Sequence, residues 1–173
     1  MAYFTAVIAR SGRAWKTRDV EVDDAKTLDQ LADALRAAAV DDQPVLAVIE
    51  HEDEWFALVR VDGDEELRLF VSDLAASTQG HYAELLAPAA DVDIAADGDD
   101  DLPDDEDGDE DEDAEEREPT VSAWAGDLDL LDDLGIGARM LRKLAEEKGD
   151  DPGAVLAEIG ETAGFSELLE ALR

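Results

Sequence analysis

Apolar and polar positions in the first half of the chain alternate in a way that is typical of β-strands. Five short apolar runs rich in β-forming residues lie at residues 3–8, 14–22, 45–49, 55–61 and 67–71. The run at 55–61 is apolar on both faces, which predicts a central strand. We therefore expect a mostly antiparallel, five-stranded sheet in residues 1–90, with 14–22 or 67–71 at an edge.

A different spacing between the second and third runs predicts a helix. Thr27 and Gln30 fit a capping box. Apolar residues then recur every three or four positions, at Leu28, Leu31, Ala32, Leu35 and Ala39. This stripe should pack on the sheet, and two shorter helices are expected after Ser72-Asp73 and at 82–86.

The last 50 or so residues have a helical rhythm throughout, beginning near Trp124. Four apolar clusters lie at residues 128–134, 140–144, 155–159 and 165–172. Gly135, Gly149 and Gly160 follow the first three clusters as expected helix stops, and Asp151-Pro152 is a typical helix start. Residues 120–173 thus predict a small C-terminal bundle of about four short helices, which docking onto the first domain or onto a partner would stabilise.

Charge divides the chain more sharply than hydrophobicity does. The 173 residues contain 48 Asp and Glu against 14 Lys and Arg, a formal net charge of −34. Half of that charge lies in residues 91–119, which hold 18 acids, one base and almost no large apolar side chain. Such a segment cannot bury enough surface to offset the entropy of ordering. We expect a disordered acidic linker between an α+β domain at 1–90 and a helical domain at 120–173.

Composition excludes several kinds of site. The chain has no cysteine, so it can form neither a disulfide nor a thiolate zinc site. The sequence His51-Glu52-Asp53-Glu54-Trp55 departs from the HExxH zinc motif at its last position and reads as a solvated turn between strands. His81 stands alone on a predicted helix. We find no catalytic constellation and expect no metal or cofactor site. A deep pocket lined by Arg60, His51 and carboxylates would instead favour a further hypothesis, an enzyme of unrecognised type built on the first domain.

Targeting signals are also missing from the pattern. The N-terminal residues lack a basic segment followed by a long apolar one, and no apolar run approaches the length that spans a bilayer. We expect a cytoplasmic protein without membrane contact.

One turn in the C-terminal segment resembles a nucleic-acid-binding motif. Residues 131–139 resemble the hairpin of a helix-hairpin-helix module, whose Gly-hydrophobic-Gly turn offers backbone N–H groups to a phosphate. The contact residues would be Gly135, Gly137, Arg139, Arg142 and Lys143. Net negative charge here and in the linker opposes a polyanion. In the alternative reading, the first glycine ends one helix and the second begins the next.

Trp124 is a further candidate contact because it stands between the acidic segment and the first C-terminal helix. It could anchor the helices on the first domain, or it could fill a pocket of a partner protein.

Taken together, six blocks resemble a known family: YFTAVIAR, DEWFALVRVDGDE, FVSDLAAS, HYAELL, DLDLLDDLGI and DDPGAVLAEIGETAGFSELLEALR, with an acidic low-complexity segment after the fourth. In this order they resemble the actinobacterial tRNA adenosine deaminase-associated protein family. The resemblance implies association with the enzyme that deaminates the wobble adenosine of tRNA. It brings no catalytic residues with it.

The absence of cysteine separates this chain from the enzyme itself. A zinc nucleobase deaminase needs a His/Cys/Cys or Cys₃ ligand set, which this sequence cannot supply. Our first hypothesis is therefore a non-catalytic accessory protein whose partner is the tRNA adenosine deaminase. The second is a nucleic-acid-binding module that uses the glycine turn. The oligomeric state stays open.

Overall fold

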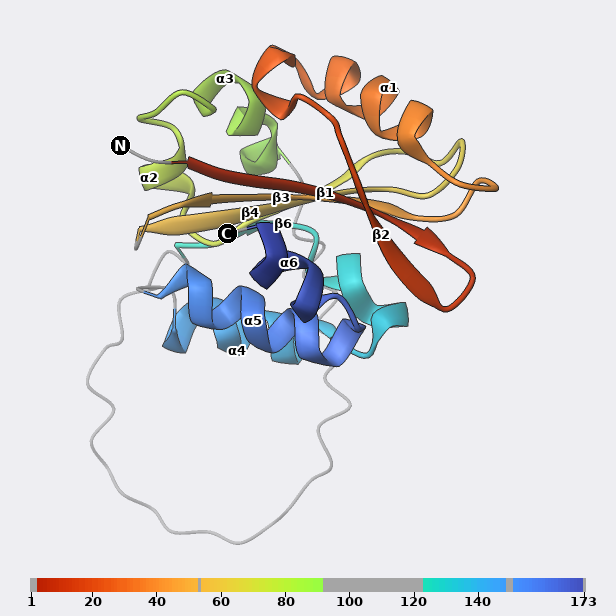
Figure 1. Ribbon diagram of the computed structural model, residues 1–173. Coiled ribbons are helices and arrows are strands. Elements are labelled where there is room, and N and C mark those ends of the chain that lie inside the picture. Colours follow the sequence, from red (N-terminus) through yellow and green to blue (C-terminus); the bar gives the residue numbers. More distant parts are fainter. Residues whose placement is uncertain (1–2, 53, 92–122, 149–150, 173) are drawn as a thin grey trace, which may run out of the picture.

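The computed structural model describes residues 3–52, 54–91, 123–148 and 151–172. A six-stranded antiparallel sheet lies between two layers of helices (Figure 1). Helices from the N-terminal half cover one face, and helices from the C-terminal segment cover the other (Figure 1). The predicted α+β class is confirmed, but the prediction of five strands is wrong.

The sheet has the order β2-β1-β3-β4-β5-β6. Its strands are β1 (Tyr3–Ser11), β2 (Ala14–Arg18), β3 (Val45–His51), β4 (Trp55–Val61), β5 (Arg68–Val71) and β6 (Ala125–Gly126). The central position of β4 is as predicted. Strand β6 covers the side of β5 that the sequence suggested as a possible edge, with Phe70 opposite Gly126.

A glycine is what allows the sixth strand to pair. Gly126 has φ +109°, and a Cβ atom built on it would lie 2.1 Å from the Leu69 carbonyl oxygen. Only glycine fits so close to a neighbouring backbone. Two residues without a large side chain carry no alternating pattern, which is why the sequence did not reveal this strand.

The N-terminal helical layer follows the predicted spacing. It contains α1 (Leu28–Ala38), α2 (Leu74–Ser77), α3 (Ala83–Leu86) and the 3₁₀ turns η1 (Val22–Asp24) and η2 (Ala87–Asp91). Thr27 caps α1, since its hydroxyl accepts a hydrogen bond from the Gln30 N–H at 3.3 Å. Leu31 and Leu35 are fully buried and pack with the apolar side chains of this face.

The C-terminal layer consists of four short helical segments, as expected. They are η3 (Leu128–Leu134), α4 (Ala138–Glu147), α5 (Pro152–Ala163) and α6 (Ser166–Leu172). Asp151 caps α5 by accepting the Ala154 N–H at 3.0 Å. Side chains of this layer, such as Leu156, share one hydrophobic core with Phe56 and other apolar residues of the sheet.

The three glycines predicted to stop helices have different outcomes. Gly135 ends η3 in the left-handed conformation, which confirms that prediction. Gly160 does not end a helix: α5 continues through it and ends at Gly164, which has φ +93°. A Cβ atom on Gly160 would lie 2.8 Å from the Ser166 Cα atom, so this glycine lets α6 approach α5. Gly149 lies outside the described residues.

The predicted acidic linker, residues 91–119, lies outside the described residues apart from Asp91, which ends η2. The linker and the domain boundaries at residues 90 and 120 therefore stay predictions.

Candidate functional site

The glycine turn of the C-terminal segment connects η3 to α4. The Gly135 N–H donates to the Asp132 carbonyl oxygen at 3.1 Å, and the Ile136 N–H donates to the Leu131 carbonyl oxygen at 3.2 Å. Gly137 occupies the N-cap position of α4. Two N–H groups of the turn are thus used inside the chain, and the turn has the geometry of a helix end followed by a helix start.

The basic residues after this turn lie on the exposed side of α4. Arg139 is exposed. The Arg142 Nε atom lies 3.1 Å from a Glu146 carboxylate oxygen, and the Lys143 Nζ atom lies 4.0 Å from one of Glu147. Acids one turn further along therefore offset two of the three candidate charges.

Trp124 faces inward, with an exposed fraction of 6%. Its ring stacks on Phe70 with 6.2 Å between ring centroids, and its indole N–H donates to Glu146 at 3.3 Å. Hydrogen bonds from Arg142 and then from this indole lower the pKa of Glu146. Trp124 packs the C-terminal layer against the sheet. This is the predicted role of an anchor within the chain, and not that of a residue that fills a partner's pocket.

A buried arginine that the sequence analysis did not single out as a binding residue links the two layers. Arg60 of β4 has an exposed fraction of 3%. Its guanidinium donates to Asp133 Oδ1 at 2.5 Å and Oδ2 at 2.7 Å, to Asp62 at 2.9 and 3.0 Å, and to the Leu130 carbonyl oxygen at 2.8 Å. The feature of the sequence that could have revealed Arg60 is a single cation inside the apolar strand sequence WFALVRV.

The cavity beside Arg60 lacks one of the residues expected of an enzyme site on the first domain. It is lined by Pro44, Arg60, Asp62, Glu65, Arg68, Asp129, Asp132 and Asp133, and His51 is not among them. Arg68 also donates to Asp62, at 2.8 Å. Since Arg60 already donates to two carboxylates and a carbonyl oxygen, this cluster has the arrangement of a structural ion pair.

Both histidines lie near the Tyr3 ring, which the sequence did not predict. Glu52 and Glu54 form an exposed turn between β3 and β4, as predicted, but His51 is the last residue of β3 with an exposed fraction of 5% and so does not belong to the solvated turn. Its ring centroid lies 4.4 Å from that of Tyr3, and the His81 centroid lies 6.2 Å from it. His81 precedes α3, and its backbone N–H donates to the Tyr3 hydroxyl at 3.2 Å.

The buried Tyr82 ring completes this aromatic cluster. The Tyr82 hydroxyl donates to an Asp23 carboxylate oxygen. Burial, together with this hydrogen bond, raises the pKa of Tyr82 well above its ordinary value. The His51 Nε2 atom has no hydrogen-bond partner among the described residues. These tilted and edge-on ring contacts extend the core at the start of β1.

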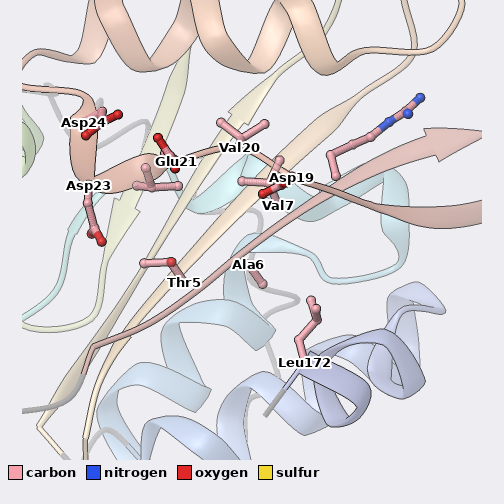
Figure 2. A pocket seen from close by; sticks show the side chains of 11 residues that line it. Thr5, Ala6, Val7, Asp19, Val20, Glu21, Asp23, Asp24 and Leu172 are labelled. Atoms are coloured by element: carbon pink, nitrogen blue, oxygen red, sulfur yellow. The ribbon is translucent and has the colours of Figure 1, made fainter.

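A further feature is a groove at the open side of β1 (Figure 2). Its volume is about 420 Å³, and it is lined by Thr5, Ala6 and Val7, by residues 18–24, and by Leu172. Leu172 of α6 has an exposed fraction of 45%, which makes it the most exposed large apolar side chain in the described ranges. The acids among residues 18–24 line one wall of this groove, and Leu172 lies on the opposite side.

Within residues 3–52, 54–91, 123–148 and 151–172, no group of three or more His, Asp or Glu side chains is placed to hold a metal ion. None of the described helices is long and apolar enough to cross a bilayer.

Comparison with known proteins gives one match. The family model described as Rv3753c-like tRNA adenosine deaminase-associated protein matches residues 3–166. No curated protein and no solved structure matches the chain. The matched range includes all six strands and every helix from α1 to α5, whereas α6 lies beyond it except for Ser166.

Proposed function

We propose a non-catalytic, accessory role beside tRNA adenosine deaminase for this chain, which belongs to the Rv3753c-like tRNA adenosine deaminase-associated family. The family match over residues 3–166 is the observation that carries the proposal. The role is one of protein–protein contact in the cytoplasm, where the enzyme and its tRNA substrate meet.

Two observations on the residues support a role without chemistry. The chain has no cysteine for the zinc ligand set of a nucleobase deaminase. Arg60, the most deeply buried cation among the described residues, is paired with Asp62 and Asp133 and so has few donors left for a substrate. Accessory function needs only a surface that complements the enzyme.

Charge supplies a physical basis for the contact. An enzyme that binds tRNA needs a positively charged face for the phosphates. The acidic residues of 91–119, 18 in number, would be attracted to such a face. The acidic segment could compete with tRNA for the enzyme, and RNA would then displace it in a salt-dependent way.

The direct test is a calorimetric titration of the full chain into the deaminase from the same source, at 50 and 300 mM salt, with wobble-adenosine conversion measured alongside. We expect saturable binding that weakens with salt and a changed conversion rate. Absence of binding at micromolar concentrations, with and without tRNA, would overturn the proposal.

The electrostatic mechanism has its own test. Replacing the acids of residues 99–116 by Ser and Gly should weaken enzyme binding steeply at low salt. The matched control exchanges Asp and Glu in the same residues, which preserves the charge and should preserve the affinity. Equal affinity of all three proteins would remove the acidic segment from the mechanism and leave the accessory role in place.

A further inference from the structure

Strand β1 has two neighbours along only part of its length. It pairs with β3 from Tyr3 to Ala9, but with β2 only from Val7 onward. The chain leaves β1 after Arg18, the partner of Val7, and rises toward η1 and α1 (Figure 1). On the side away from β3, residues 3–6 therefore have no strand paired with them in the register, and the outward-facing residues there are Tyr3 and Thr5.

The register shows which backbone groups face the open side. The Arg10 N–H donates to the Pro44 carbonyl oxygen at 2.9 Å, so even-numbered residues of β1 direct their N–H and C=O groups toward β3. Successive residues of an antiparallel ladder alternate between the two sides. The N–H and C=O groups of Thr5 consequently point away from β3, one step beyond the last pair with β2.

The groove follows this open edge. Figure 2 shows Thr5, Ala6 and Val7 along β1, with Val20 and Glu21 on the side of α1 and Leu172 on the opposite side. An extended chain beside residues 3–6 would thus lie between residues 18–24 and the end of α6. Alternate side chains of such a strand would point toward these two walls.

The wall formed by residues 18–24 determines the charge of the occupant. Asp19, Glu21, Asp23 and Asp24 line the groove, against one cation, Arg18. A hydrogen bond with Asp24 and the charge of that carboxylate raise the pKa of Glu21, which shows how closely the acids are placed. Lysine or arginine side chains would relieve this repulsion.

We propose that the open edge of β1 binds an extended, positively charged segment of a partner protein as an added strand. Backbone hydrogen bonds to Thr5 and Tyr3 supply the affinity, as in other cases of strand addition, and the acids of residues 19–24 select the charge. Leu172 covers an apolar side chain of the bound segment.

Two other occupants are opposed by the same charges. The chain's own segment 91–119, with 18 acids and one base, is repelled by the groove. A second copy would bring its own row of carboxylates against the first. The inference concerns a partner's basic segment and does not require that partner to be the deaminase.

The test uses the full chain and a fluorescent probe peptide, acetyl-KVTVKVK-amide, titrated by anisotropy at 50 mM salt. Two control peptides test the charge and the backbone hydrogen bonds separately. One has Glu in place of Lys. The other carries N-methyl groups on alternate residues, which preserve the charge of the peptide and remove the backbone donors of those residues. We expect both controls to bind at least about tenfold more weakly than the probe. Equal binding of the N-methylated peptide would overturn strand addition.

Matched proline variants locate the contact. Thr5→Pro removes the outward N–H at the open edge, and Thr17→Pro removes an outward N–H from the far side of β2, since Thr17 lies opposite Ile8 between two hydrogen-bonded pairs. Only the first should abolish probe binding. Loss of binding in Thr17→Pro alone would move the contact to β2 and refute the proposal.

A variant without proline substitutions tests the charge of the groove, and its result does not depend on whether the proline variants fold. Asp19→Asn, Glu21→Gln and Asp24→Asn together should lower probe affinity about tenfold at 50 mM salt and much less at 500 mM. Asp23 is left unchanged because it accepts the Tyr82 hydroxyl. Unchanged affinity would overturn the charge selection. Sedimentation of the wild type checks for a dimer, and a dimer that Thr5→Pro dissociates would show a second copy in the groove instead.

Discussion

Arg60 and Asp133 form a two-pronged ion pair between the central strand and the first C-terminal helical segment, with nitrogen–oxygen distances of 2.5 and 2.7 Å. The guanidinium is buried, whereas the carboxylate side chain is 55% exposed. The pair fixes η3 on the sheet face that the C-terminal helices cover. Because the Arg60 guanidinium is buried, loss of this ion pair should lower the stability of the fold more than loss of a surface ion pair would.

Asp133→Asn should lower the free energy of unfolding by about 1–2 kcal/mol, because Arg60 keeps Asp62 and the Leu130 carbonyl but loses one charge partner. Urea denaturation followed by circular dichroism measures the change. Asp132→Asn, at the exposed neighbouring position outside the pair, is the control and should stay within about 0.5 kcal/mol of the wild type. Equal effects of the two variants would contradict the assigned role.

The same pair predicts a pH dependence. The hydrogen bond from Arg60 holds the pKa of Asp133 below its ordinary value of 3.8. A carboxyl with a lowered folded-state pKa stabilises the fold above its unfolded pKa and loses that contribution as the pH falls through the folded one. The difference in unfolding free energy between wild type and Asp133→Asn should be constant from about pH 5 to 7 and shrink below about pH 4. A difference that grows on acidification would exclude this origin.

Gly160→Ala should destabilise the protein by about 1–3 kcal/mol, because a methyl group would meet the Ser166 backbone where α5 and α6 are closest. Thermal unfolding measures the effect. Gly137→Ser is the control, since a Cβ atom there has an ordinary 3.5 Å contact and serine is a favourable N-cap residue. A stabilising Gly160→Ala, as helix propensity alone would predict, would contradict the close packing.

Replacement of Trp124 distinguishes packing from partner recognition. Trp124→Ala should cost about 3–5 kcal/mol because the stack on Phe70 is lost. Trp124→Phe should cost less, since it preserves most of the burial and loses the hydrogen bond to Glu146. Both are measured by urea denaturation. Full stability of Trp124→Ala would favour a role at an intermolecular contact.

The glycine turn predicts a negative result with nucleic acid. The full chain should show no saturable binding of tRNA by fluorescence anisotropy at 50 mM salt, because acids lie beside Arg142 and Lys143. Saturable binding that the substitutions Arg139→Ala, Arg142→Ala and Lys143→Ala abolish would revive the nucleic-acid hypothesis.

Much of the fold could be predicted because the spacing of apolar residues along the chain follows from which side of each strand or helix is buried. The strand at 55–61, the cap at Thr27 and the helix start at Asp151 each have a local signal in the sequence. Strand β6 has none, since it depends on the approach of the distant strand β5 to Gly126. The continuation of α5 through Gly160 has none either, since this glycine is required by the close approach of Ser166 and not by a helix end.

The functional features were harder to predict for a related reason. The pairing of Arg60 with Asp133 joins residues that are 73 positions apart. The groove at β1 depends on where β2 stops pairing, at Arg18 rather than at the predicted residue 22. Hydrophobic patterning extends to Val22, which is buried in the 3₁₀ turn η1 and not in the strand. The apolar character of Val22 predicts its burial but does not distinguish a strand residue from a residue of a 3₁₀ turn.

The shared core of the sheet and the C-terminal helices has a practical consequence for how the polypeptide tolerates a break. Residues 3–91 supply five strands, whereas residues 123–172 supply the sixth strand and one whole helical layer. Neither fragment covers both faces of the sheet by itself. A chain cut by a protease between residues 91 and 123 should remain assembled as a noncovalent pair, and the two fragments produced separately should restore the fold by complementation.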